Sequence, residues 1–375
     1  MRNYCIFFVI LLMLILSNNL IFCKEMPSFL SDKSVILVVA DVGSIRDDGN
    51  NNFVPTTKIV QINDGKPVIL QEFKVKQTIK VKIYHEYGLV LISSLNDLMS
   101  DFVDLNVINM YKPRLNNKFT THFRELIFPI QYNNNTCLIS YIFWREKNLP
   151  ESKIIDLKTM KASRVDLDFM RKQLDEGYVI LKKEDKLIFK RGGLGESSFP
   201  YIPPQRIFED IDKLQIICNS KDHLVLKSYY YPDELSAQNS NDFIIFSKKS
   251  RDWQKINIKA QIIDAKVIYP YLLCKLGNIS PQGINYPEEY TGEWSIYNLE
   301  TQKMFKLKYQ PDSNIVYATS NFLLVANSNK LFYVNLQNDK PLLDKETIIY
   351  EDIKDDIGTS KEIVRYIQGA FLTLS

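Results

Sequence analysis

Apolar and polar positions recur along this chain in one hairpin pattern. In WSIYNLETQKMFKLK (294–308) an apolar run, a four-residue polar turn and a second alternating run follow one another. The same pattern returns at 58–73, 153–167 and 330–344. Because a period of two places successive side chains on opposite faces of an extended strand, the pattern predicts antiparallel β-hairpins and not helices.

Weaker copies near Ile108, Phe189 and Phe246 bring the number of hairpins to seven. Their mean spacing is about 46 residues, in the range of repeats that form four strands each. A second hairpin precedes several of them, at 81–94, 213–230, 265–277 and 314–328. Each repeat is therefore expected to contain strands A, B, C and D, with runs that are apolar throughout covered on both faces.

The two ends of the chain complement each other. Residues 362–375 have the pattern of an A–B pair without a C–D hairpin, and 33–41 and 58–73 supply the missing strands. Joining both ends in one blade closes a ring and hides the exposed sheet edges. We expect an all-β chain with one β-propeller domain at 24–375, seven four-stranded blades and a mostly water-filled axial channel. Six or eight blades remain alternatives, because two of the copies are weak.

The hairpin motif, three apolar residues followed by Asp or Asn and then Leu, occurs at Asp156-Leu157 and Asn298-Leu299. In this feature the chain resembles the β-propeller superfamily, most nearly the TolB-like and YVTN-type propellers of secreted bacterial proteins. The sequence has no GH…WD pairs, no double-glycine kelch motif and no series of docking tryptophans. FSKKSRDWQKI (246–256) is one residue short of a sialidase Asp-box and lacks its glycine. The resemblance implies a fold and assigns no catalytic residue.

Composition supports a globular chain, with 45% hydrophobic and 24% charged residues. The formal net charge is only +3, and no block of Lys and Arg stands out, so a nucleic-acid partner is not expected. Residues 1–23 are typical of a signal peptide: Arg2 precedes an apolar run at 5–16, which is shorter than the roughly 20 residues of a membrane-spanning helix. The mature chain is expected to be secreted or extracytoplasmic. Acylation of Cys23 and an uncleaved anchor are the alternatives.

Chemical motifs are sparse. The mature chain keeps three cysteines without CxxC spacing and three histidines without metal-ligand spacing, so we expect buried free thiols, structural histidines and neither a metal nor another cofactor. These residues are Cys137, Cys218, Cys274, His85, His122 and His223. RGGLGESS (191–198) lacks the Lys-Ser/Thr of a phosphate loop, and DDGNNN (47–52) lacks the spacing of a calcium loop. Asn134 and Asn278 begin glycosylation sequons that matter only in a eukaryotic source.

Three long connections between strands B and C, at 42–56, 231–242 and 277–293, are the candidate ligand-binding region. Hairpin turns need only two to five residues, so longer loops call for another explanation. Tyrosine offers a large contact area at low entropic cost, and carboxylates favour hydroxyls or positive charge. The candidate residues are Arg46, Asp47, Asp48, Tyr231, Asp233, Glu234, Tyr286, Glu288, Glu289 and Tyr290.

Together these features favour a binding or scaffolding propeller, secreted or on the cell surface, that recognises a protein or glycan. The chain is expected to be a monomer without a membrane span after the leader. A propeller enzyme acting on glycans, as a hydrolase or lyase, would need paired carboxylates that the sequence cannot place. A structural component of the cell envelope is a further alternative.

The leader generates a first testable prediction. We expect exported protein to begin near Lys24, because the apolar run at 5–16 has the length of a signal-peptide core. N-terminal sequencing of material recovered outside the cytoplasm checks this. An intact Met1 would show an uncleaved anchor, and incorporation of labelled lipid at Cys23 would show a lipoprotein.

Overall fold

The computed structural model describes most of the chain after residue 32. The described residues are 33–41, 56–63, 66–74, 77–95, 100–112, 116–144, 149–175, 177–182, 186–191, 196–199, 204, 207, 213–228, 241–278, 289–309, 313–327, 330–351 and 365–374. Nearly all of them form antiparallel strands, grouped into five four-stranded sheets and one seven-stranded sheet. The all-β prediction is confirmed.

The sheets are numbered here in chain order. Sheet 1 consists of β27 (Arg365–Leu374), β1 (Lys33–Asp41), β2 (Thr56–Asn63) and β3 (Lys66–Lys74). Sheet 2 consists of β4 (Gln77–Tyr84), β5 (Leu89–Leu95), β6 (Phe102–Asn109) and β7 (Asn116–His122). Sheet 3 consists of β8 (Leu126–Tyr132), β9 (Asn135–Trp144), β10 (Leu149–Asp156) and β11 (Ala162–Arg164).

The second half of the chain forms the other three sheets. Sheet 4 consists of β14 (Glu196–Ser198), β13 (Lys186–Lys190), β12 (Tyr178–Lys182), β15 (Lys213–Asn219), β16 (His223–Ser228), β17 (Asp242–Ser247) and β18 (Asp252–Asn257). Sheet 5 consists of β19 (Ile262–Ile268), β20 (Tyr271–Asn278), β21 (Glu289–Asn298) and β22 (Met304–Lys308). Sheet 6 consists of β23 (Ser313–Ala318), β24 (Phe322–Asn327), β25 (Lys330–Gln337) and β26 (Lys340–Glu351).

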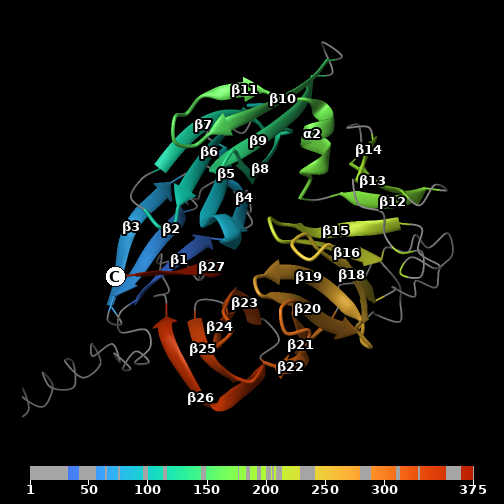
Figure 1. Cartoon of the computed structure of the whole chain (residues 1–375). Helices are drawn as coiled ribbons and strands as arrows, with labels where there is room; N and C mark the ends of the chain where they lie inside the picture. The colour runs from blue at the N-terminus through green and yellow to red at the C-terminus, as the bar shows by residue number, and fades with distance from the viewer. Residues whose placement is uncertain are drawn as a thin grey trace, which may run out of the picture.

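The sheets follow one another around a common axis in chain order, with the first strand of each repeat on the inside (Figure 1). This is the arrangement of a β-propeller. All seven hairpins expected from the sequence are C–D hairpins in the structure, including the weak copies at β6–β7 and β13–β14. Seven repeats are therefore distributed over six sheets.

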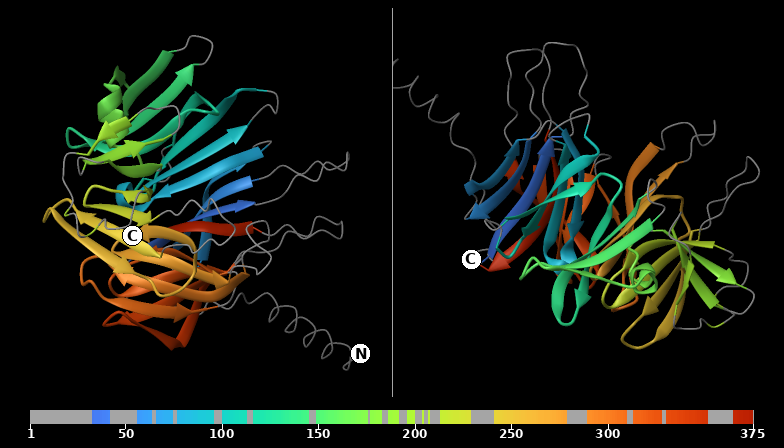
Figure 2. Two further views of the ribbon diagram at one scale, coloured as in Figure 1. Left: turned by 90° about the vertical axis from the view of Figure 1, so that its right-hand side faces the viewer. Right: turned by 90° about the horizontal axis from the view of Figure 1, so that it is seen from above.

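The chain ends pair with each other as expected, with one correction. β27 pairs antiparallel with β1 from Lys33↔Leu374 to Asp41↔Arg365, with a bulge at Val38/Val39. The C-terminal strand lies beside the N-terminal one in all three views (Figures 1 and 2). Residues 365–374 form one strand at position A, and not the A–B pair that the sequence suggested, because β1 takes position B.

Sheet 4 departs from the expected four-stranded repeat. Within the described residues, the repeat of β12, β13 and β14 has strands B, C and D but no strand A. Its β12 instead pairs antiparallel with β15, the inner strand of the following repeat, from Tyr178↔Gln215 to Ile180↔Lys213. The helix α2 (Leu167–Lys172) precedes it, capped by the Asp166 carboxylate, which accepts from the Asp168 and Phe169 amides. Met170 of this helix is fully buried in the core shared with sheet 3.

The Asp or Asn of the repeated motif has a local structural role. The Oδ1 atom of Asn298 accepts from the amides of Glu300 and Thr301 at 2.9 and 3.0 Å, and that of Asp156 does the same for residues 158 and 159 at 2.7 and 3.0 Å. The fourth turn residues, Met160 and Gln302, have positive φ angles of 59° and 60°. Such side-chain bonds stabilise a tight turn. The motif therefore encodes the C–D turn and not a functional site.

Alternate residues of the apolar runs pack into opposite neighbouring sheets. In β1, Val35 and Leu37 pack against Leu324 of sheet 6. Ile36 and Val38, between them, pack against sheet 2. Both faces of β1 are thus covered by neighbouring sheets, so a run that is apolar throughout is stable as a strand. Figure 2 shows the sheets stacked in this way.

Side chains from several sheets pack together at one end of the axis. The A–B turn of sheet 2 forms the 3-10 helix η2 (His85–Tyr87). His85 stacks on Phe371 of β27 at 4.9 Å between ring centroids and lies 5.8 Å from the Tyr317 ring of β23. Glu86 accepts a hydrogen bond from the Lys221 amide of sheet 4 at 2.6 Å. Four of the six sheets therefore meet at this end.

The closing strand leads to a prediction about stability. Removing residues 363–375 takes away β27 and exposes the inner edge of β1, so we expect the melting temperature to fall by at least about 10 °C, or the cooperative transition to disappear. Glu72→Ala, at an exposed position of the same sheet, is the control and should change stability by less than about 0.5 kcal/mol. An unchanged melting temperature after truncation would show that the ring does not depend on this strand.

His85 leads to a prediction about pH. Burial, with a smaller contribution from the Lys266 charge, lowers the pKa of His85 to about 3. Between pH 6.5 and 3 the unfolded chain therefore binds a proton that the folded protein does not, and stability falls as pH falls. Going from pH 7.5 to 4.5, wild type should lose about 3 kcal/mol more than His85→Gln. Urea unfolding at both pH values measures the difference, and equal losses in the two proteins would refute it.

Candidate functional site

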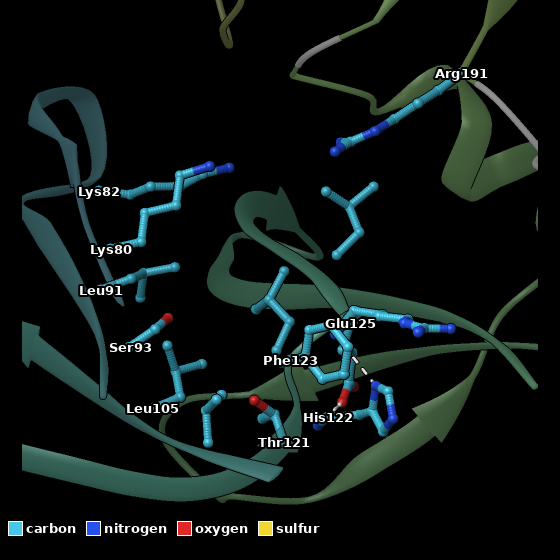
Figure 3. Close-up of a pocket in the computed structure, with 14 residues that line it drawn as sticks. Lys80, Lys82, Leu91, Ser93, Leu105, Thr121, His122, Phe123, Glu125 and Arg191 are labelled. Carbon is cyan, nitrogen blue, oxygen red and sulfur yellow. Dashed lines mark hydrogen bonds between the residues drawn. The ribbon is translucent and has the colours of Figure 1, made fainter. Parts of the chain in front are cut away.

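A cavity of about 220 Å³ lies between sheets 2 and 3 (Figure 3). Fourteen residues line it, from strands β4, β5, β6 and β7, from the turn and first residues leading into β8, and from the end of β13. They are Lys80, Lys82, Leu91, Ser93, Val103, Leu105, Thr121, His122, Phe123, Arg124, Glu125, Leu126, Ile127 and Arg191. The lining residues include several cationic side chains and several apolar ones.

Strand alternation places the two lysines in the cavity. Val81 and Ile83 of β4 pack toward sheet 1, against the core that contains Phe371. Lys80 and Lys82 alternate with them and so face the other way, toward sheet 3. Figure 3 shows both lysine side chains extended into the cavity.

The turn between β7 and β8 is held by its own polar groups. Glu125 is the centre: its carboxylate accepts from the His122 amide at 3.3 Å, from the hydroxyl of Ser140, and forms an ion pair with Lys153 at 3.4 Å. The Arg124 amide donates to Nδ1 of His122 at 3.1 Å. Among the described lining residues, Glu125 is the one carboxylate, and it is engaged by groups of sheets 2 and 3.

Arg191 reaches the same cavity from the opposite side (Figure 3). It follows β13, in the repeat whose described residues include no inner strand. The same repeat also contributes Asp175, which lies 3.9 Å from Nζ of Lys82 and accepts from the Tyr84 hydroxyl at 3.0 Å. Residues after α2 thus contact β4 of sheet 2 directly.

The cavity has a polar and an apolar part. Four cationic side chains line the cavity, namely those of Lys80, Lys82, Arg124 and Arg191, together with the carboxylate of Glu125. Lys82 is also ion-paired with Asp175, and Glu125 with Lys153. The wall is formed by the side chains of β5, β6 and β8, of which Leu91, Val103 and Leu105 are almost completely buried. Positive charge next to apolar surface favours an anion with an apolar portion.

Exposed aromatic rings border the cavity at the turn. Phe102 and Phe123 are about half exposed, at 51% and 48%. His122 lies between them, edge-on to Phe102 at 5.7 Å and stacked on Phe123 at 4.9 Å. The Arg124 guanidinium lies 4.9 Å from the centre of the Phe123 ring. This edge offers a flat contact surface of the kind that is enriched at binding sites.

The candidate residues of the long loops fall in two groups. Arg46, Asp47, Asp48, Tyr231, Asp233, Glu234, Tyr286 and Glu288 lie outside the described residues. Glu289 and Tyr290 belong to β21 and pair with Asn278 and Gly277 of β20. The connection expected at 277–293 is therefore shorter than predicted, because strand pairing continues into both of its ends.

The three cysteines are free thiols, as expected: Cys137 and Cys274 are buried, and Cys218 is partly exposed, with desolvation raising its pKa to about 12. His85 packs against rings of sheets 1 and 6, and desolvation lowers the pKa of His223. Only His122 lines the cavity. Within the described part of the chain, no group of three or more His, Cys, Asp and Glu side chains is arranged to hold a metal ion.

Sequence reasoning missed the cavity. Its residues come from three repeats and share no motif. One signal was present: KVKIY (80–84) alternates lysine with apolar residues on a strand expected at the inner position, where a charged face is unusual. The RGGLGESS segment was interpreted as a surface loop, although its first residue, Arg191, lines the cavity.

No protein-family model matches the chain, and no curated protein sequence matches it. Among solved structures, it is similar to the β-propeller domain of the Trilobed protease from Pyrococcus furiosus, with 10% identity, 86% of this chain and 96% of that chain covered, and a TM-score of 0.45. It is also similar to AztD from Citrobacter koseri, with 10% identity, coverage of 91% and 98%, and a TM-score of 0.39.

A third similar structure is a putative 6-phosphogluconolactonase from Bacteroides fragilis, with 11% identity, coverage of 92% and 99%, and a TM-score of 0.43. These likenesses are distant, and no activity is transferred from them. Among the described residues, no helix has the length and apolar character needed to cross a membrane.

Proposed function

We propose that the protein is a binding propeller that acts outside the cytoplasm and recognises a protein or glycan with the face that carries its B–C connections. The resemblance to secreted propellers and the leader at residues 1–23 support the location. One structural observation supports the binding face, namely the unequal length of the connections on the two faces of the ring.

In a propeller, A–B and C–D turns lie on one face, and B–C and D–A connections on the other. The A–B and C–D turns here are short, such as those at 133–134 and 338–339. Three long connections are of the B–C type, at 42–55, 229–241 and 279–288, and two are of the D–A type, at 199–212 and 352–364, on the same face. The B–C connection of sheet 6, by contrast, spans only 328–329. Extra loop length costs conformational entropy without adding to the core. Its concentration on one face favours a role in recognition.

The alternative of a glycan hydrolase or lyase finds less support at the cavity. A pair of carboxylates at a suitable separation is the usual requirement for glycoside hydrolysis. Glu125 is the one carboxylate in the cavity lining, and it is bound to Lys153, Ser140 and the His122 amide. A binding role is the better explanation for this chemistry.

The binding face can be tested with an array of immobilised glycans and secreted proteins. A variant with all three long B–C connections replaced by short Gly-Ser turns should bind the wild-type ligand at least about tenfold more weakly, since each loss of 1.4 kcal/mol is a factor of ten. Binding should weaken moderately between low and physiological salt, as expected for exposed charges. Affinities are measured on ligands identified by the array.

Lys158→Ala, at an exposed position in a C–D turn on the other face, provides the matched control and should bind normally. A ligand that binds the loop-shortened variant as well as it binds wild type would place the site elsewhere, such as the segment 192–206.

A further inference from the structure

We infer that the cavity between sheets 2 and 3 is a binding site for a small organic anion with a compact apolar body, such as an aromatic carboxylate. None of its lining residues belongs to the three long loops. The site is therefore independent of the loop face proposed above, and either can be wrong without the other.

The size of the cavity sets the size of the ligand. A water molecule has a share of about 30 Å³ in the liquid, so a space of 220 Å³ corresponds to about seven waters. A single inorganic ion fills only part of this volume. A ring with one charged substituent fits it better.

The charge of the cavity sets the sign of the ligand. Four cationic side chains line it, and they come from three separate parts of the chain: β4, the turn before β8 and the end of β13. Figure 3 shows Lys80 and Lys82 on one side and Arg191 on the other, all directed toward the same space. Since the whole protein carries a formal charge of only +3, this is a local concentration and not a general property of the surface. An anion placed between them gains charge-assisted hydrogen bonds from both sides.

The wall of the cavity sets the character of the ligand's body. Leu91, Val103 and Leu105 present apolar surface, and exposed Phe123 extends it to the rim. Burying a ligand's apolar portion there contributes about 25 cal/mol per Å² removed from water. Only the Ser93 and Thr121 hydroxyls accompany the charged groups on the neighbouring strands, and these are too few for the many hydroxyls of a sugar.

The ligand class can be tested on the full-length mature protein by calorimetry or by NMR titration. The probes are benzoate, benzyl alcohol, acetate, inorganic phosphate and glucuronate. Benzoate should bind saturably, and each of the other four at least about tenfold more weakly. Benzyl alcohol lacks the charge, and acetate, phosphate and glucuronate lack the apolar ring. Equal binding of benzoate and acetate would refute the apolar body, and equal binding of benzoate and benzyl alcohol would refute the anion site. Glucuronate binding as tight as benzoate would overturn the preference for an apolar ring.

Substitutions of lining residues test whether benzoate binds in this cavity. Lys80→Gln combined with Arg191→Gln should weaken benzoate binding at least about tenfold. Lys306→Gln, an exposed lysine on β22, is the matched control and should leave it unchanged. Ser93→Leu fills the cavity while keeping every charge, and should abolish binding in a protein whose melting temperature is retained. Unchanged binding in the double variant or in Ser93→Leu would refute the site. The loop-shortened protein should bind benzoate as wild type does.

Discussion

The pairing of β27 with β1 is the interaction on which the rest of the structure depends. Each sheet of a propeller buries both faces against its neighbours, so a ring with a free side leaves apolar sheet faces and a strand edge exposed. In this chain the first and last described strands meet along nine residue pairs, from Lys33↔Leu374 to Asp41↔Arg365. On either side of this pair, Leu37 of β1 packs with side chains of sheet 6 and Ile36 packs with side chains of sheet 2.

The irregular repeat at 167–198 contributes to the cavity. Among the described residues, six of the seven repeats have an inner strand, and the seventh has α2 before β12, which pairs with the inner strand of the next repeat. The residues around it, Asp175 and Arg191, approach β4 from the opposite side. A regular blade would place a strand there. The charged side chains around the cavity therefore lie next to the irregular repeat.

The periodic features of this fold could be predicted from the sequence, and the features that depend on the departure from the repeat could not. Period-two alternation and the Asp or Asn at the C–D turns identified all seven hairpins and the pairing of the chain ends. The missing inner strand was not recognised, although Asp166 followed by Leu167, Met170 and Leu174 has the cap and spacing of a short helix. The cavity could not be found, because its charges come from repeats separated by more than a hundred residues and meet only in the folded ring.

The position of the closing strand also determines when the protein can fold. β1 and β27 are the first and last of the described strands, so the contact that completes the ring has the largest sequence separation of any strand pair among them. Contacts of this kind form late and slowly, since a long loop must close before they contribute. The ring can therefore close only after β27 has been synthesised. The strands of sheets 2 to 6 are contiguous in sequence and can pair before that, so the earliest strand of the chain is the one that waits longest for its partner.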